Sequence, residues 1–121
     1  MRICVTAQTD SLESEIDPRF GRCSYFIFVD SDSMQFEAEQ NPSVSAMGGA
    51  GVQAGQLVAD KEAQVVLTGN VGPNAFQTLK AANIEIITGV SGNIKEAVEK
   101  YKNGKLKSSE DPNVGSKFGM K

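Results

Sequence analysis

With 121 residues and a formal net charge of −3, the chain has the size of one domain. A domain of this size can bury a hydrophobic core without disulfides or a structural metal to stabilise it. The negative balance argues against a broad nucleic-acid surface, and the sequence has no run of about 18 apolar residues that could span a membrane. The chain enters a strand-like segment without a signal pattern, and Cys4 and Cys23 make no disulfide framework. We therefore expect a cytoplasmic protein with both thiols reduced.

Strands and loops alternate in the first half of the chain. Residues 2–6 and 25–30 are rich in β-branched and aromatic side chains, which predicts buried strands. Residues 34–39 alternate apolar and polar side chains, as a half-exposed strand does, and the turn-like Ser-Asp-Ser before them predicts a hairpin. The predicted loops of this half are residues 7–22 and 41–51.

Helices and strands alternate in the second half. Pro73 suits the first position of a helix, Asn93 with Glu96 resembles a capping box, and Gly104 is a fitting helix stop. Apolar side chains recur at helical spacing along these segments. The predicted elements are helix 52–61, strand 64–68, helix 74–82, strand 84–88 and helix 93–103.

This order predicts an α/β fold with one mixed sheet. The right-handed crossover rule makes the later strand–helix units parallel, and the early hairpin requires one reversed strand. The expected sheet has five strands in the order 3-2-1-4-5 with strand 2 antiparallel, covered by three helices. The topology is similar to that of ribonuclease H, but strand 2–6 carries none of the carboxylates with which such nucleases hold metal ions.

Residues 17–23, Asp-Pro-Arg-Phe-Gly-Arg-Cys, form the loop with the most chemistry. All the arginines of the chain lie within its first 22 residues, and two of them, Arg19 and Arg22, are close to Cys23. Arginines beside a thiol favour the thiolate, which ligates metals, although Cys23 could instead be a small buried residue. The arginines could pair with Asp17 or Glu15, and Phe20 is expected to be exposed as part of a contact surface.

Glycine-rich turns precede all three predicted helices, at residues 48–51, 69–72 and 89–92. Helix N-termini favour anions, and the binding crevice of an open α/β sheet lies at the carboxyl ends of its parallel strands. The loop and two of these turns, at 69–73 and 89–92, should therefore meet at one edge, although glycines could serve tight geometry alone. The sequence has no phosphate-loop or dinucleotide fingerprint, and without any histidine it offers no Ser-His or Cys-His pair, so we expect no enzyme.

Several motifs together resemble the dinitrogenase iron–molybdenum cofactor biosynthesis family, which includes NifX and the C-terminal domain of NifB. The resemblance covers about residues 1–107, which we take as the domain, and leaves residues 108–121 as a flexible tail, although residues 112–119 are also similar to small members. It implies a ribonuclease H-like sheet and a carrier of iron–sulfur cofactor precursors. The motifs are Asp-x-Arg-Phe-Gly-Arg-Cys-x-Tyr-Phe at 17–26, Asn-Pro at 41–42, Gly-Ala-Gly at 49–51, Thr-Gly-Asn-Val-Gly-Pro-Asn-Ala at 68–75 and Leu-x-x-Ala-x-Ile at 79–84.

The resemblance implies a non-catalytic protein that binds or carries an anionic iron–sulfur or iron–molybdenum type cluster, or a precursor, transiently and with donor or acceptor proteins as partners. The family's carriers use a histidine where this chain has Glu85, so Cys23 is the candidate metal ligand, with Met47 second. Two Cys23 thiolates in a dimer would bind more tightly than one. The alternative is a metal-free regulatory or interaction module that binds a small anion or a protein partner. The predicted cofactor-binding residues are Arg19, Phe20, Gly21, Arg22, Gly49, Gly51, Gly69, Asn70, Gly72 and Asn74.

Overall fold

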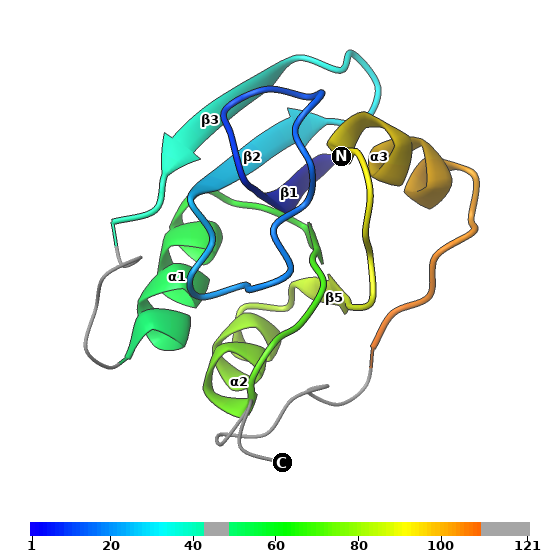
Figure 1. Cartoon of the computed structure of the whole chain (residues 1–121). Helices are drawn as coiled ribbons and strands as arrows, with labels where there is room; N and C mark the ends of the chain where they lie inside the picture. The colour runs from blue at the N-terminus through cyan, green and yellow to red at the C-terminus, as the bar shows by residue number, and fades with distance from the viewer. Residues whose placement is uncertain (43–48, 110–121) are drawn as a thin grey trace.

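A single mixed sheet organises the fold in the computed structural model, which describes residues 1–42 and 49–109. Within these residues the strand order is β3-β2-β1-β4-β5, with β2 antiparallel to both neighbours and β1, β4 and β5 parallel, so the predicted order and direction are confirmed (Figure 1). The similarity to ribonuclease H remains a prediction. The strands are β1 (Arg2–Ala7), β2 (Tyr25–Asp30), β3 (Phe36–Gln40), β4 (Val65–Leu67) and β5 (Glu85–Ile87).

Helices cover the two faces of this sheet unequally. The first two helices pack against each other on one face, and the third packs on the opposite face (Figure 1). Alternation along β1 serves both sides, because Cys4 belongs to the core under the helix pair while Ile3 and Val5 belong to the core under the third helix. The helices of the described residues are α1 (Ala50–Asp60), α2 (Pro73–Ala81) and α3 (Ile94–Lys102).

The three helices begin in different ways. Gly49 precedes α1 in the left-handed conformation, with φ of 72°, which glycine adopts without strain. Pro73 occupies the first turn of α2, as the sequence predicted. Asn93 caps α3, since its side chain accepts a hydrogen bond from the backbone N–H of Glu96 at 3.3 Å. Each helix lies within two residues of its predicted bounds.

The chain after α3 returns to the sheet beside β5. The backbone N–H of Ser109 donates to the carbonyl of Ile86 at 2.7 Å, and the Ser109 hydroxyl accepts from the N–H of Thr88 at 3.1 Å. The Ser108 hydroxyl donates to Glu85. Residues 108 and 109 are thus held by the sheet, while the rest of the predicted tail, residues 110–121, lies outside the described residues. No helix among the described residues is long and apolar enough to cross a membrane.

Candidate anion-binding pocket

A cavity of about 400 Å³ lies where the loop after β1 meets the starts of α1 and α2. Nine of the ten residues predicted to bind a cofactor line it, and only Gly69 does not. The predicted metal ligand Cys23 does not line it either, and Met47 and Gly48 lie outside the described residues. The lining residues are Arg19, Phe20, Gly21, Arg22, Gly49, Ala50, Gly51, Val52, Asn70, Gly72, Pro73, Asn74 and Ala75.

Two helix N-termini open onto this cavity. Among the described residues, no side chain caps α1 or α2, and neither helix carries an acidic residue in its first turn. The first backbone N–H groups of a helix and its dipole attract negative charge, and an acid in the first turn would offset that attraction. Both helix starts are therefore suited to an anion.

The third helix differs from these two. Besides the cap from Asn93, the N–H groups of Ile94 and Lys95 donate to the carbonyls of Ser14 and Leu12, at 3.0 and 3.1 Å. Its first turn also contains an acidic residue. The turn before α3 supplies none of the residues that line the cavity. It still meets the loop and the 69–72 turn at this edge, as expected, because the N–H of Ile16 donates to the carbonyl of Gly92 and the N–H of Gly89 to the carbonyl of Gly69, both at 2.8 Å.

Glycines let the loop after β1 pack directly on backbone. A Cβ on Gly69 would lie 2.7 Å from the Cα of Pro18, and one on Gly21 would lie 3.1 Å from the backbone N of Gly51. A Cβ on Gly51 would in turn lie 3.2 Å from the Cβ of Ala75 on α2. The loop thus contacts α1 backbone to backbone, α1 contacts α2 through the small side chain of Ala75, and Gly69 serves the close approach of Pro18 rather than the lining of the cavity.

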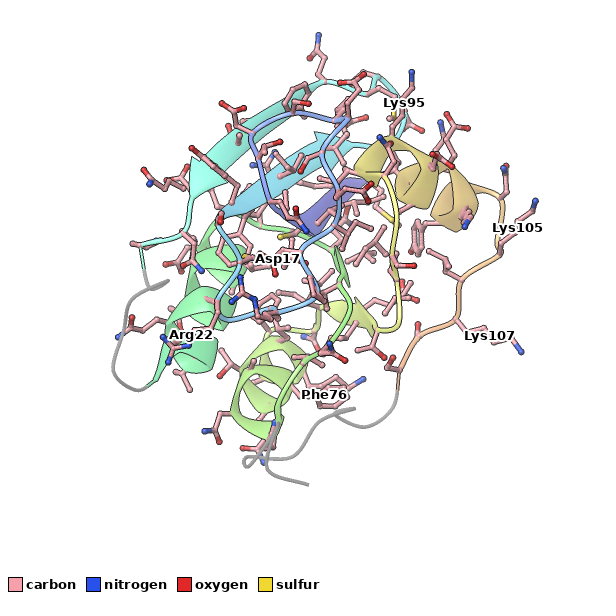
Figure 2. All side chains as sticks on the ribbon, viewed as in Figure 1. Asp17, Arg22, Phe76, Lys95, Lys105 and Lys107 are labelled. Carbon is pink, nitrogen blue, oxygen red and sulfur yellow. The ribbon has the colours of Figure 1, made fainter. Side chains whose placement is uncertain are left out.

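A buried carboxylate holds one of the two arginines. The side chain of Asp17 is only 4% exposed, and its Oδ1 accepts from the backbone N–H and the Nε of Arg19 at 3.0 and 3.2 Å. Its Oδ2 accepts from Nη2 of the same arginine at 3.2 Å. These hydrogen bonds and the Asp17 charge raise the pKa of Arg19. The other arginine, Arg22, lies beside the start of α1 (Figure 2).

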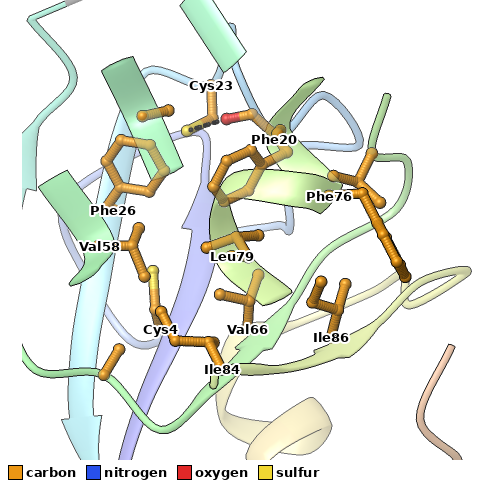
Figure 3. Packing of buried hydrophobic residues seen from close by; sticks show 14 of the residues in the cluster. Cys4, Phe20, Cys23, Phe26, Val58, Val66, Phe76, Leu79, Ile84 and Ile86 are labelled. Atoms are coloured by element: carbon orange, nitrogen blue, oxygen red, sulfur yellow. Dashed lines mark hydrogen bonds between the residues drawn. The ribbon is translucent and has the colours of Figure 1, made fainter. Parts of the chain in front are cut away.

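The aromatic of the loop is buried, contrary to the sequence prediction, and the thiol follows the buried alternative that the sequence left open. Phe20 is 2% exposed, because its ring packs on that of Phe26 with a centroid distance of 5.7 Å (Figure 3). Cys23 has no exposed surface, and its Sγ donates to the carbonyl of Phe20 at 3.4 Å. Burial, followed by the charge of Asp17, raises the pKa of the Cys23 thiol far more than Arg19 lowers it. In this conformation Cys23 is therefore a buried, protonated thiol, and its role as a metal ligand stays a prediction.

Sequence reasoning missed Asn41 as part of the site. This residue is 2% exposed, and its Nδ2 donates to the carbonyls of Cys23 and Gly21 at 2.9 and 3.2 Å. It therefore ties the end of β3 to the loop that carries the arginines. The Asn-Pro pair after a strand was visible in the sequence as a motif, but its partners lie about 20 residues away and only the fold reveals them.

The family model described as dinitrogenase iron–molybdenum cofactor matches residues 1–104. The chain belongs to this family. The resemblance found in the loop and turn motifs is thereby confirmed.

Solved structures agree with this assignment. The apo form of the orange protein from Desulfovibrio gigas is 40% identical over 93% of this chain and 95% of its own, with a TM-score of 0.90. A putative NifB protein from Thermotoga is 32% identical over 88% of this chain and 91% of its own, with a TM-score of 0.77. A putative dinitrogenase from Methanocaldococcus jannaschii, 14% identical with a TM-score of 0.69, shares the fold.

A curated relative is less informative about activity. It is an uncharacterized protein of Methanocaldococcus jannaschii, 26% identical over 100 residues, which make up 80% of this chain and 85% of the relative.

Proposed function

We propose that this protein is a non-catalytic carrier of an anionic metal–sulfur cluster, of iron–sulfur or iron–molybdenum type, or of a precursor of such a cluster. The observation that carries the proposal is the meeting of two arginines and two helix N-termini, which no side chain of the described residues caps, around one cavity of about 400 Å³. The family's name supplies the chemical class of the cargo.

The charge pattern favours an anion over a neutral ligand. Arg19 and Arg22 line the cavity together with the starts of α1 and α2, and no acidic side chain is among its described lining residues. Guanidinium and backbone N–H donors make charge-assisted hydrogen bonds to anionic acceptors, which are about twice as strong as neutral ones. In a molecule with a net charge of −3, such a concentration of positive potential marks a local binding site.

The lining also suits a cargo that must leave again. Two small buried residues of the helix starts, Ala50 and Ala75, make part of the lining apolar, which strengthens electrostatic contacts beside them. The described lining contains no thiolate, so a preassembled cluster would be held by charge and hydrogen bonds rather than by coordination. Such binding is reversible, as exchange with donor and acceptor proteins requires.

Ligation by Cys23 is the competing way to hold the cargo. It requires residues 20–23 to open, because the sulfur is buried beneath Phe20 and hydrogen-bonded to its carbonyl. Opening would also break the contacts of Asn41 with this segment. We therefore propose that Cys23 supports the loop, and that its replacement by alanine leaves loading intact.

The test is anaerobic titration with a synthetic, thiolate-ligated [4Fe–4S] dianion, followed by desalting, visible absorption and metal analysis. We expect Arg19→Gln and Arg22→Gln each to weaken binding about tenfold, as the loss of a charge-assisted contact does. Lys95→Gln is the matched control, because it removes the same charge from an exposed residue of α3.

Each result has a defined meaning. Loss of binding in Cys23→Ala alone would replace the charge-based mode by thiolate ligation. No uptake by the wild type, together with saturable phosphate binding that needs the arginines, would favour the metal-free module instead. An equal effect of Lys95→Gln and the arginine variants would mean that net charge, and not the cavity, governs binding.

A further inference from the structure

A carboxylate stands directly behind a cavity built for anions. Asp17 is 3% exposed and carries a formal negative charge next to Arg19, which lines the cavity. On electrostatic grounds alone this charge opposes an anionic ligand. Burying a charge costs free energy of folding unless the charge is paired, so a buried carboxylate at this position calls for an explanation.

Asp17 is itself anchored in the sheet. Its backbone N–H donates to the carbonyl of Thr6 at 3.0 Å, and the Thr6 hydroxyl donates to the Asp17 carbonyl at 2.7 Å. The hydroxyls of Thr6 and Thr68 lie 2.8 Å apart, so β1 and the end of β4 share the same buried cluster. The carboxylate therefore has a fixed position relative to the parallel strands.

The carboxylate grips Arg19 from two sides. Oδ1 and Oδ2 accept from Nε and Nη2, both at 3.2 Å, while Oδ1 also accepts the backbone N–H at 3.0 Å. This fork fixes the plane of the guanidinium, although the arginine side chain is 59% exposed. An arginine so exposed would otherwise sample many rotamers and lose that freedom on binding a ligand.

We infer that Asp17 is a positioning residue that preorganises Arg19 for the anionic ligand; the inference rests on the proposed function. The carboxylate gives up some electrostatic attraction and in return keeps the remaining guanidinium donors in place at the cavity. Its effect on the ligand is therefore exerted through Arg19 and not by contact.

The two possible roles of Asp17 predict opposite signs. Asp17→Asn keeps the size of the side chain but removes the negative charge, and the amide nitrogen cannot accept from the guanidinium. If only charge matters, the variant binds the [4Fe–4S] dianion more tightly. If positioning dominates, it binds about tenfold more weakly, although the site has become more positive.

A double-mutant cycle with Arg19→Ala separates positioning from general damage to the loop. In that background Asp17→Asn should leave the dissociation constant unchanged or lower it, because there is no guanidinium left to position. Weaker binding in both backgrounds would overturn the inference, as would equal or tighter binding of Asp17→Asn beside an intact Arg19.

A readout without ligand keeps the inference separate from the proposed function. The chain has three arginines, so the Nε–Hε signals are assigned by single Arg→Lys changes and their order parameters measured in the free protein. We expect Arg19 to be rigid in the wild type and mobile in Asp17→Asn, with Arg2 unchanged. An Arg19 signal that stays rigid refutes the inference even if the cluster binds; failure of the wild type to bind, with a rigid Arg19, refutes only the carrier function.

Discussion

Gly69→Ala tests whether close backbone packing places the arginines. The new Cβ would lie 2.7 Å from the Cα, 2.9 Å from the Cβ and 3.0 Å from the carbonyl oxygen of Pro18, whereas ordinary contacts begin at 3.4 Å. Backbone and ring must therefore separate by about 0.7 Å, which is the difference between 3.4 and 2.7 Å. Overpacking of this kind costs about 1–3 kcal/mol.

The displaced segment leads directly into Arg19. The loop and the turn are joined on both sides of the clash, by the N–H of Asn70 to the carbonyl of Pro18 at 2.7 Å and the N–H of Phe20 to the carbonyl of Asn70 at 3.2 Å. We expect urea unfolding to report the lost stability and cluster titration to show binding weakened about tenfold, because misplaced donors lose a charge-assisted contact.

Gly104→Ala supplies a matched control for this experiment, because Gly104 follows α3 and does not line the cavity. Its Cβ meets nothing within 4 Å, but its φ of +71° strains an alanine by about 1–2 kcal/mol. The two variants should therefore lose similar stability, while only Gly69→Ala loses affinity. Unchanged stability and unchanged binding in Gly69→Ala would refute the packing argument, and equal loss of affinity in both variants would show that binding merely follows stability.

Three further predictions concern the supports of the loop and the far face. Burial raises the pKa values of Cys4 and Cys23, so unfolded chains release these protons first, and stability falls as the pH rises above about 8.5. In Cys23→Ala the unfolding free energy, measured by urea titration, should fall less steeply with pH, by about 1.4 kcal/mol per pH unit between about pH 9 and 10.5. The same slope in the variant and the wild type would contradict the burial of this thiol. Asn41→Ala should cost about 1–3 kcal/mol and weaken cluster binding, since two carbonyls lose their donor; binding at wild-type strength would mean that the loop does not need this tie. Asn93→Ala should cost about 1 kcal/mol in thermal unfolding and leave cluster binding unchanged, because it caps α3 away from the pocket; altered binding would show that the two faces are coupled.

Local patterns predicted the fold well because each element agrees with its own periodicity. Strand β2 occupies its predicted residues, and the buried side chains of α2, Ala75, Phe76 and Leu79, follow the helical spacing from which this helix was predicted. The strands β4 and β5 are each two residues shorter than predicted, because the predicted ends leave the regular parallel ladder. Such ends depend on neighbouring strands and not on the segment itself.

The residues of the site that lie in turns and helix starts could be predicted from the sequence. The exposure of the loop's side chains could not, because it depends on how the loop packs in the fold. Glycine-rich turns followed by helical spacing, with Pro73 at the first position of one helix, indicated two helix starts, so most of the lining residues could be named. The proximity of arginine to Cys23 in the sequence suggested a reactive thiol, yet Cys23 is fully buried and Asp17 pairs with Arg19. The burial of Cys23 depends on packing with β2, α1 and α2, which the order of residues does not reveal.

The stack of Gly21 on Gly51, and of Gly51 on Ala75, has a consequence for how the site can be recognised in other sequences. At these positions the loop, α1 and α2 come close because side chains are missing, so the shape of the cavity wall depends on residues that stay small. Substitution of exposed neighbours such as Val52 can alter the rim while this close packing persists. In a sequence such a site is recognised by a set of positions that must be glycine or alanine. A search for similar sites should therefore consider these small residues as well as charged or metal-ligating side chains.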